Sequence, residues 1–494
     1  MAGPVVYAQW SNVYTGPEVA NGLATQGLDR EGNGGQHIMG ERSKVAVVGS
    51  GYVGTVVAAC LASVGREVVG VEIDPEKLAK LQRGSAPFFE PGLTERLLDG
   101  VESGRLTFTD DFEVALVDAE VVFLCVDTPP GETGHPDMRS VTAAARSIGR
   151  AMHAPHVLVT KSTVPVGSGN WLETVIENEL PEGMDPEALS VVSNPEFLRE
   201  GSAVEDFLHP DRIVLGGDQP AAVDTVADVY RPILEQAFPG GDKTKRPVLV
   251  TTSRSTAETI KYAANAFLAT KISFINEIAG ICEAVGADVQ EVAYGIGLDS
   301  RISDRFLNAG LGWGGSCFGK DVLALAAMAR EYGREPHILE AIRRVNDDQR
   351  DMVVRKLQKH LRPLRGRRIT LLGLAFKPNT DDTRDAPALT IARSLIAKGA
   401  VVKAYDPMVK EIPEIPELKT TADPYAAVER ADAVVLVTEW PEFRELDFEA
   451  VASRMKGRCF LDGRNAVDPA TVRAAGLEYE GVGRADSHPV SMFD

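Results

Sequence analysis

Cysteine and positive charge are both in short supply in this sequence, and each shortage excludes a class of protein. Five cysteines in 494 residues are too few and too widely spaced for a disulfide framework, which predicts reduced thiols and a cytoplasmic location. Lys and Arg number 52 against 71 Asp and Glu, so the net charge is −19. An acidic balance of this size argues against nucleic-acid and anionic-membrane partners, although a local site can still hold a small anion.

The N-terminal region lacks the basic stretch and apolar core of a secretory signal. Residues 1–42 show no hydrophobic periodicity, and we expect them to form a disordered leader. The uncharged run from Val45 to Gly65 is long enough for a membrane span, but glycines interrupt it. We interpret it as a buried strand, a glycine turn and a small-residue helix, which together begin a βαβ unit.

Strand-like and helical segments alternate in both halves of the chain. Apolar runs at 121–126, 157–160, 189–193 and 213–215 predict a parallel sheet with helices on both faces. Residues 255–258 (Ser-Thr-Ala-Glu) fit a capping box, which predicts a long helix that runs to Val285 and is ended by Gly286. A second α/β region starts at Arg368. We therefore expect an α/β protein with two Rossmann-like, doubly wound lobes (43–250 and 347–494) joined by a long helix and a small helical domain (251–346).

A glycine-rich turn lies between the first strand and its helix, and it consists of Gly49, Ser50, Gly51, Tyr52, Val53 and Gly54. Its glycines permit close approach of a pyrophosphate, which the helix N-terminus stabilises. Glu72 ends the next strand, where a carboxylate accepts from ribose hydroxyls and repels a 2′-phosphate. The predicted cofactor is therefore NAD. Lys77 either reaches the phosphates or is a solvated helix lysine.

Thr128 and Thr163 each follow a strand at the edge where doubly wound sheets bind ligands. Both therefore point toward the predicted cofactor, although ordinary turn chemistry explains their positions equally well. Lys261 and Asn265 lie four residues apart on the long helix and could stabilise an oxyanion, or form a plain polar stripe. Glu196 and Glu200 offer two carboxylates after a strand, and a surface role fits them equally.

One cysteine differs from the other four. Apolar neighbours predict core positions for Cys60, Cys125, Cys282 and Cys459. Cys317 instead follows a glycine-rich loop at the predicted start of a helix, where the helix N-terminus and a nearby lysine favour the nucleophilic thiolate. Asp321 shares its helix face and could handle a proton or a water.

Several long segments together resemble the UDP-glucose/GDP-mannose dehydrogenase family of nucleotide-sugar 6-dehydrogenases, and within it the group acting on UDP-glucose. The resemblance covers Lys44 to about residue 470 and is carried by GSGYVG, KSTVPVG, NPEFLREG, KYAANAFLATKISFINEI, GWGGSCFGKD, FKPNTDDTRD and LDGRN. It implies that the first lobe binds NAD and that the second binds the nucleotide of the sugar. It also implies oxidation of the C6 alcohol to a carboxylate in two NAD-dependent steps.

The resemblance implies a role for each matching residue. Cys317 would be the nucleophile, Asp321 a base or water activator, Lys261 and Asn265 the oxyanion partners, and Glu196 and Thr163 groups that position water or move protons. Cofactor contacts would come from Glu72, Lys77, Thr128, Glu200, Lys320 and Arg384. Sugar-nucleotide contacts would come from Phe197, Leu198, Asn308, Gly312, Gly314, Phe376, Lys377 and Arg464. Arg301 would reach the sugar of a neighbouring subunit, which implies at least a homodimer, and no metal is expected.

Two departures from the family pattern concern the cofactor and the cysteine loop. Glu72 stands where aspartate is commonest, and Gly319 stands where the family often has proline or another side chain. Alternative substrates are TDP-glucose, GDP-mannose and UDP-N-acetylmannosamine. Two other classes are a two-electron 3-hydroxyacid dehydrogenase, which needs no thiol, and an inactive NAD-binding sensor, which needs none of the catalytic set.

Overall fold

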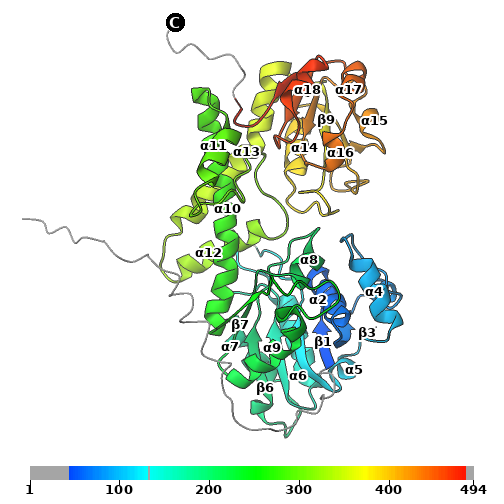
Figure 1. The fold of residues 1–494 in the computed structure, drawn as a ribbon, viewed down its shortest axis with the longest axis vertical. Helices are drawn as coiled ribbons and strands as arrows, with labels where there is room; N and C mark the ends of the chain where they lie inside the picture. The colour runs from blue at the N-terminus through cyan, green and yellow to red at the C-terminus, as the bar shows by residue number, and fades with distance from the viewer. Residues whose placement is uncertain (1–43, 132–133, 485–494) are drawn as a thin grey trace, which may run out of the picture. The chain divides into compact units, whose positions relative to one another are not determined.

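The first sheet of the computed structural model has eight strands in the order β3-β2-β1-β4-β5-β6-β7-β8 (Figure 1). The structure describes residues 44–131 and 134–484, so the predicted leader lies outside the described residues. The strands are β1 (Lys44–Val48), β2 (Glu67–Val71), β3 (Leu106–Thr109), β4 (Ala119–Leu124), β5 (His156–Thr160), β6 (Leu189–Ser193), β7 (Arg212–Gly216) and β8 (Val248–Thr252).

Helices cover both faces of this sheet, as predicted. One apolar core joins the sheet to α2 (Tyr52–Ser63), α3 (Pro75–Leu81), α4 (Leu93–Glu102), α8 (Ala203–Leu208) and α9 (Pro220–Leu234). A second core joins the opposite face to α5 (Phe112–Leu116), α6 (Arg139–Ala151) and α7 (Ser168–Glu177). Strand residues such as Val47 and Val48 point to different cores because successive side chains alternate across a strand.

The sheet departs from the predicted all-parallel arrangement at one place. β6 and β7 pair antiparallel, through Ser193 and Gly216 alone, whereas every other neighbouring pair in the sheet is parallel. The chain between them, which contains Glu196, Glu200 and the short helix α8, returns without a full crossover helix. Asn194, the first residue of this segment, lies beside the carboxyl end of β5, because its N–H donates to the Thr160 carbonyl.

The predicted long helix is α10 (Arg254–Val285), whose 32 residues span about 48 Å at the usual rise. Its left-handed cap Gly286 was predicted, but the capping box was wrong. Ser253 caps the helix, and its hydroxyl accepts from the Thr256 N–H. Glu258, the other half of the predicted box, is buried and bonds to α7 instead.

Three more helices pack around α10 in the middle of the chain, namely α11 (Val289–Gly297), α12 (Phe318–Glu331) and α13 (His337–Leu361). Ser273 on α10 donates to the Ile342 carbonyl of α13, and the Trp313 indole donates to the same hydroxyl. Asn276, one turn further along, accepts from Gly310 N–H. These bonds fix the glycine-rich loop before Cys317 against the long helix.

A second, fully parallel sheet has six strands in the order β11-β10-β9-β12-β13-β14. The strands are β9 (Arg368–Leu372), β10 (Val401–Tyr405), β11 (Lys419–Thr420), β12 (Ala433–Leu436), β13 (Cys459–Asp462) and β14 (Glu478–Glu480). Its helices are α14 (Pro387–Ala397), α15 (Pro424–Val428), α16 (Pro441–Arg444), α17 (Phe448–Arg454) and α18 (Pro469–Ala474). The two sheets and the long helix confirm the predicted fold class.

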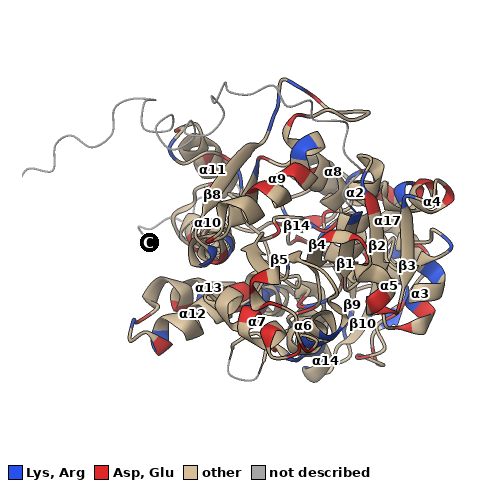
Figure 2. Cartoon of the chain, turned by 90° about the horizontal axis from the view of Figure 1, so that it is seen from below, with Lys and Arg blue, Asp and Glu red and all other residues tan. Residues whose placement is uncertain are grey.

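Charged residues of both signs lie side by side along surface helices such as α3 and α4 (Figure 2). Over residues 44–131 and 134–484, none of the helices combines the length and the apolar character that a membrane crossing requires.

Candidate active site

The glycine turn after β1 is tightly packed, and no side chain covers the free N–H groups in the first turn of α2. A Cβ at Gly54 would lie 1.8 Å from the Gly49 carbonyl oxygen, so only glycine allows this approach. Gly51 is the N-cap residue and brings no side chain over the helix N–H groups. The Ser50 hydroxyl donates to the Val71 carbonyl and ties the turn to β2. This open helix end fits the pyrophosphate of a dinucleotide.

Glu72 lies directly after β2 and is 7% exposed. One of its carboxylate oxygens accepts from the Asp74 N–H at 2.9 Å. This bond keeps the carboxylate close to the end of β2, although glutamate has one methylene more than the aspartate that is common in the family. Lys77 lies exposed in the first turn of α3, which Asp74 caps. The structure therefore places the carboxylate at the expected edge of the sheet and leaves the lysine on the surface.

The two predicted threonine loops contact each other. The buried Thr128 hydroxyl donates to the Thr163 carbonyl at 2.9 Å, so the loops after β4 and β5 are joined. Thr163 is buried and lies in the wall of a small pocket that Lys261 also lines.

Lys261 and Glu196 form a buried ion pair, with 2.7 Å between Nζ and Oε1. Burial alone would lower the pKa of Lys261, but the Glu196, Asp321 and Cys317 side chains raise it above its usual value. Burial alone would raise the pKa of Glu196, but the Lys261 ammonium and the Leu198 N–H hold it below its usual value. The pair is therefore held charged, and the surface interpretation of Glu196 is wrong.

Asn265, one turn beyond Lys261, donates to Asp321 Oδ2 at 2.6 Å. The other oxygen of Asp321 accepts from Lys320 Nζ, also at 2.6 Å. Asp321 is only 1% exposed. The two donors, which come from α10 and α12, orient its buried carboxylate. The structure thus brings four predicted residues together between α10 and α12, namely Lys261, Asn265, Lys320 and Asp321.

Cys317 is the N-cap residue of α12, and its free thiol is half-buried, whereas the other four cysteines are buried as predicted. The expected thiolate is not favoured. Burial is the main cause that raises the pKa of Cys317, and Glu196 adds to it, which outweighs the opposing ammonium groups of Lys261 and Lys320. A Cβ at Gly319 would lie at ordinary contact distance, 3.6 Å from Asp385, so this departure from the family does not reflect crowding.

Glu200 links residues from three parts of the chain. Its Oε1 accepts from Ser316 Oγ at 3.0 Å and from Arg384 at 3.2 Å. Ser316 Oγ in turn lies 3.6 Å from Cys317 Sγ, and Arg384 also binds Asp382. Burial and the neighbouring Asp382 raise the pKa of Glu200 to about 7. The predicted cofactor contacts Glu200 and Arg384 therefore meet beside the cysteine.

The predicted sugar-nucleotide residues of the cysteine loop pack onto α13 and the second sheet. Gly312 has a left-handed backbone, and a Cβ there would lie 2.4 Å from Asn346 Oδ1. Arg464 donates to the Gly312 and Val437 carbonyls and pairs with Glu439. The guanidinium thus lies against the loop before Cys317.

The remaining predicted residues divide into partly buried and exposed positions. Gly314 packs on the Asp385 backbone, the Lys377 ammonium lies 5.4 Å from the Phe376 ring centroid, and burial lowers the pKa of Lys377. Phe197 lies under the Arg212 guanidinium, and Leu198 donates to Glu196. Asn308 is exposed, and so is Arg301, which pairs with Asp299 rather than with the cluster.

Sequence reasoning missed two charged groups at this site. Glu258 is buried and accepts from Gly167 N–H, Gly169 N–H and the Ser193 hydroxyl. Lys161 is buried and donates to Asn194 Oδ1. Both could have been noticed as charged residues at predicted core positions, Glu258 one turn before Lys261 and Lys161 at a strand end.

Three family models match the chain in order. Residues 43–234 match the NAD binding domain of the UDP-glucose/GDP-mannose dehydrogenase family, residues 255–348 its central domain, and residues 370–469 its UDP binding domain. A UDP-glucose 6-dehydrogenase of Rhizobium meliloti is 46% identical over 90% of this chain and 100% of its own length. One of Pseudomonas aeruginosa is 43% identical, over 89% and 97%.

Solved structures agree with this assignment. A UDP-glucose dehydrogenase of Pyrobaculum islandicum is 38% identical and superimposes with a TM-score of 0.82, over 91% of this chain and 100% of that one. A UDP-D-ManNAc dehydrogenase of Pyrococcus horikoshii is 28% identical with a TM-score of 0.77, over 89% and 99%. The chain belongs to the UDP-glucose/GDP-mannose dehydrogenase family.

Proposed function

We propose that the chain is an NAD-dependent UDP-glucose 6-dehydrogenase, which oxidises the C6 alcohol of UDP-glucose to the carboxylate of UDP-glucuronate. The observation that carries this proposal is the thiol of Cys317 at the start of α12, surrounded by Lys261, Asn265 and Asp321. The names of relatives at 43% and 46% identity support the substrate. Residues 43–250 would bind NAD, residues 251–346 would form the central domain, and residues 347–494 would bind the nucleotide.

Each of the two oxidations removes a hydride from C6, and NAD would supply the acceptor for it when bound. The uncovered N-terminus of α2 and the Glu72 carboxylate would hold its pyrophosphate and ribose. Thr128, Lys77 and Lys320 remain proposed contacts to it. The Glu200–Arg384 ion pair joins a loop of residues 43–250 to a loop of residues 347–494. It would therefore close the NAD site on the side of the second sheet.

Cys317 would do the covalent chemistry. Its sulfur adds to the aldehyde carbon formed by the first oxidation, and the thiol proton passes to the carbonyl oxygen, which gives a thiohemiacetal. The raised pKa fits a thiol that loses its proton only as the carbon–sulfur bond forms. Lys261 and Asn265 would stabilise negative charge on the C6 oxygen. After the second oxidation, water cleaves the thioester, with Asp321, Glu196 and Thr163 orienting the water or accepting its proton.

The stoichiometry of the reaction tests this proposal most directly. We expect two NADH per UDP-glucose consumed, measured by absorbance against chromatographic quantification of the sugar nucleotide. One NADH per sugar would favour a two-electron hydroxyacid-type dehydrogenase. No NADH with any sugar nucleotide would favour a sensor that only binds NAD.

The choice of sugar nucleotide needs a separate comparison. TDP-glucose, GDP-mannose and UDP-N-acetylmannosamine would undergo the same chemistry at Cys317. We expect kcat/KM to be highest for UDP-glucose in assays of the four compounds with the same enzyme preparation. A higher value for any other compound would reassign the substrate while leaving the chemistry intact.

We also propose a cytoplasmic homodimer or larger homo-oligomer. Phe267, Phe274 and Ile281 recur every seven residues on α10, so they share one helix face, and each is about half exposed or more. A second copy of the chain is the proposed cover for this face, with Arg301 reaching the partner's sugar. Sedimentation velocity tests the association, and replacing Phe267 and Phe274 by glutamate should give a monomer.

A further inference from the structure

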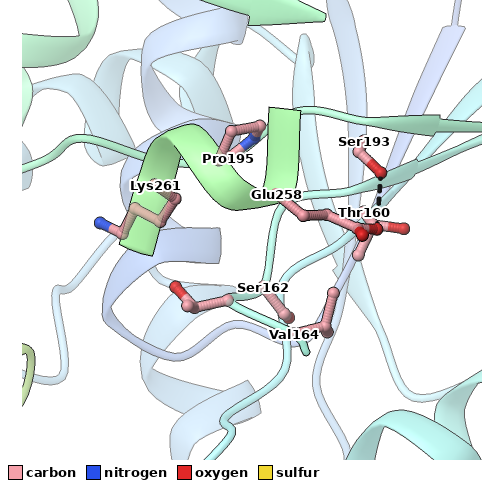
Figure 3. A pocket seen from close by; sticks show the side chains of 8 residues that line it. Thr160, Ser162, Val164, Ser193, Pro195, Glu258 and Lys261 are labelled. Atoms are coloured by element: carbon pink, nitrogen blue, oxygen red, sulfur yellow. Dashed lines mark hydrogen bonds between the residues drawn. The ribbon is translucent and has the colours of Figure 1, made fainter. Parts of the chain in front are cut away.

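A small pocket lined mainly by polar residues lies between the start of α10 and the ends of β5 and β6 (Figure 3). Its walls are formed by Thr160, Ser162, Thr163, Val164, Ser193, Pro195, Glu258 and Lys261. Figure 3 shows the Thr160, Ser193 and Glu258 side chains gathered at one end, while the Lys261 ammonium points away from that end. The pocket therefore extends from a buried polar group toward residues of the proposed catalytic cluster.

The buried end of the pocket has a hydroxyl group without a protein partner. Thr160 is 2% exposed, and its Oγ1 has no hydrogen-bond partner within the described residues. A buried polar atom of this kind is costly unless something satisfies it. The pocket has a cavity volume of about 10 Å³, which has room for a single water.

Other polar groups of the pocket can complete the coordination of one water. Glu258 Oε1 accepts from Ser193 Oγ at 3.0 Å and from Gly169 N–H at 3.3 Å, whereas Oε2 accepts only from Gly167 N–H at 2.6 Å and has a second lone pair to offer. Ser162 Oγ donates to the Val126 carbonyl at 2.6 Å and keeps its own lone pairs. A water between Thr160 and Glu258 would thus have two to three partners, the number that buried waters usually find.

We propose that this pocket binds one water molecule and supplies it as the nucleophile that cleaves the thioester on Cys317. The water oxygen bonds to the thioester carbon, the carbon–sulfur bond breaks, and the sugar leaves as a carboxylate. One water proton is transferred to the cysteine sulfur, and the other is released to solvent. Thr160 and Glu258 act as positioning residues, because they hold the water without touching the sugar. The inference rests on the proposed function.

The pocket shares the side chains of Lys261 and Thr163 with the proposed catalytic cluster. Lys261 forms part of the pocket, and its ammonium also acts electrostatically on Cys317. Thr163, another wall residue, is joined through its carbonyl to the Thr128 hydroxyl of the loop after β4. The pocket therefore adjoins side chains that are proposed to act at the reacting carbon.

The substitution Thr160→Val tests the proposal, because valine has the shape of threonine but cannot bind the water. We expect kcat to fall about ten-fold or more, as for loss of a hydrogen bond to the nucleophile. Rapid mixing should then show a burst of two NADH per active site. Intact mass spectrometry of the quenched protein should show the sugar-nucleotide acyl group on Cys317. Thr160→Ser, which keeps the hydroxyl, should restore steady-state turnover without a burst.

A matched control separates this effect from general damage to a strand. Thr370→Val removes a hydroxyl that is equally buried, in β9, where it donates to the Ala427 carbonyl. It should lower the melting temperature without a burst. Unchanged turnover in Thr160→Val, or a fall without a burst or an acyl adduct, would overturn the proposal. So would a rise in its melting temperature at full activity, since removing an unpartnered hydroxyl from a dry cavity is stabilising. The wild-type ratio of two NADH per sugar tests the proposed function independently.

Discussion

Lys161 is a buried charge whose removal should change the pH dependence of stability. It follows β5, is 6% exposed, and donates to Asn194 Oδ1 at 3.0 Å. Within the residues that the structure describes, no carboxylate lies within ion-pairing distance of its ammonium. Burial lowers the pKa of Lys161 from 10.5 to about 8. The perturbation is Lys161→Met, which keeps the length of the side chain and leaves Asn194 Oδ1 its bond from the Tyr230 hydroxyl.

The size of the effect follows from this pKa difference. A lowering of about 2.5 pH units corresponds to about 3 kcal/mol, because each unit is worth about 1.4 kcal/mol. Between pH 8 and 10.5 the unfolded chain binds the proton and the folded chain does not. The wild type therefore becomes more stable as pH rises through this window, and it carries the full penalty below pH 8. Methionine does not titrate, so its contribution to stability does not change with pH. The free energy of unfolding of the variant, relative to that of the wild type, should therefore decline by about 2 kcal/mol from pH 7 to pH 9.5.

Urea unfolding of both proteins at several pH values between 7 and 9.5 measures this difference. Lys243→Met, which removes an exposed lysine from the same lobe, is the matched control. A difference between wild type and Lys161→Met that stays constant across the range would refute the reasoning. It would mean that the ammonium is solvated or paired in the folded protein.

Three further predictions concern the cysteine and the glycine turn. Cys317→Ser should lower turnover by about a thousand-fold or more, since an ester is a poor substitute for the thioester; NADH production near the wild-type rate would contradict the covalent mechanism. Because burial raises the pKa of Cys317, its alkylation by iodoacetamide, followed by peptide mass spectrometry, should still be accelerating above pH 9, and a plateau near pH 7 would contradict the burial argument. Gly54→Ala should weaken NADH binding, measured by fluorescence, about ten-fold or more, because its Cβ meets the Gly49 carbonyl. Gly295→Ala, a helical glycine with open space around it, should bind as the wild type does.

Much of the fold was predictable because its signals are local. The apolar runs, the glycine turn and the left-handed cap at Gly286 each depend on a few neighbouring residues. Buried and exposed residues alternate in the edge strand β3, and the edge strand β8 is partly exposed. Neither strand has a continuous apolar run, so neither was predicted from the sequence. The antiparallel pairing of β6 and β7 depends on how a connecting segment returns, which periodicity does not report.

The candidate site was predictable in its membership but not in its electrostatics. Lys261, Asn265 and Asp321 were identified by helix spacing and resemblance, and the structure does bring them together. The raised pKa of Cys317 depends on burial and on Glu196, which is distant in sequence. Glu258 was assigned to a capping box because Ser255 precedes it at the right spacing. Ser253 serves as the cap instead, and the carboxylate accepts from Gly167 and Gly169 at the start of α7.

The continuity of α10 limits how this chain can change in length. Glu258 near its start is fixed to the N-terminus of α7, and Glu283 near its end pairs with Lys356 and accepts from Gly483 N–H. Inserting one residue between them would turn one end by about 100° and shift it by about 1.5 Å relative to the other. Both sets of bonds could not then form, and Lys261 would leave its partner if the far end were kept. Insertions and deletions should therefore be confined to the surface loops, and the number of residues in this helix should be the most invariant length in the molecule.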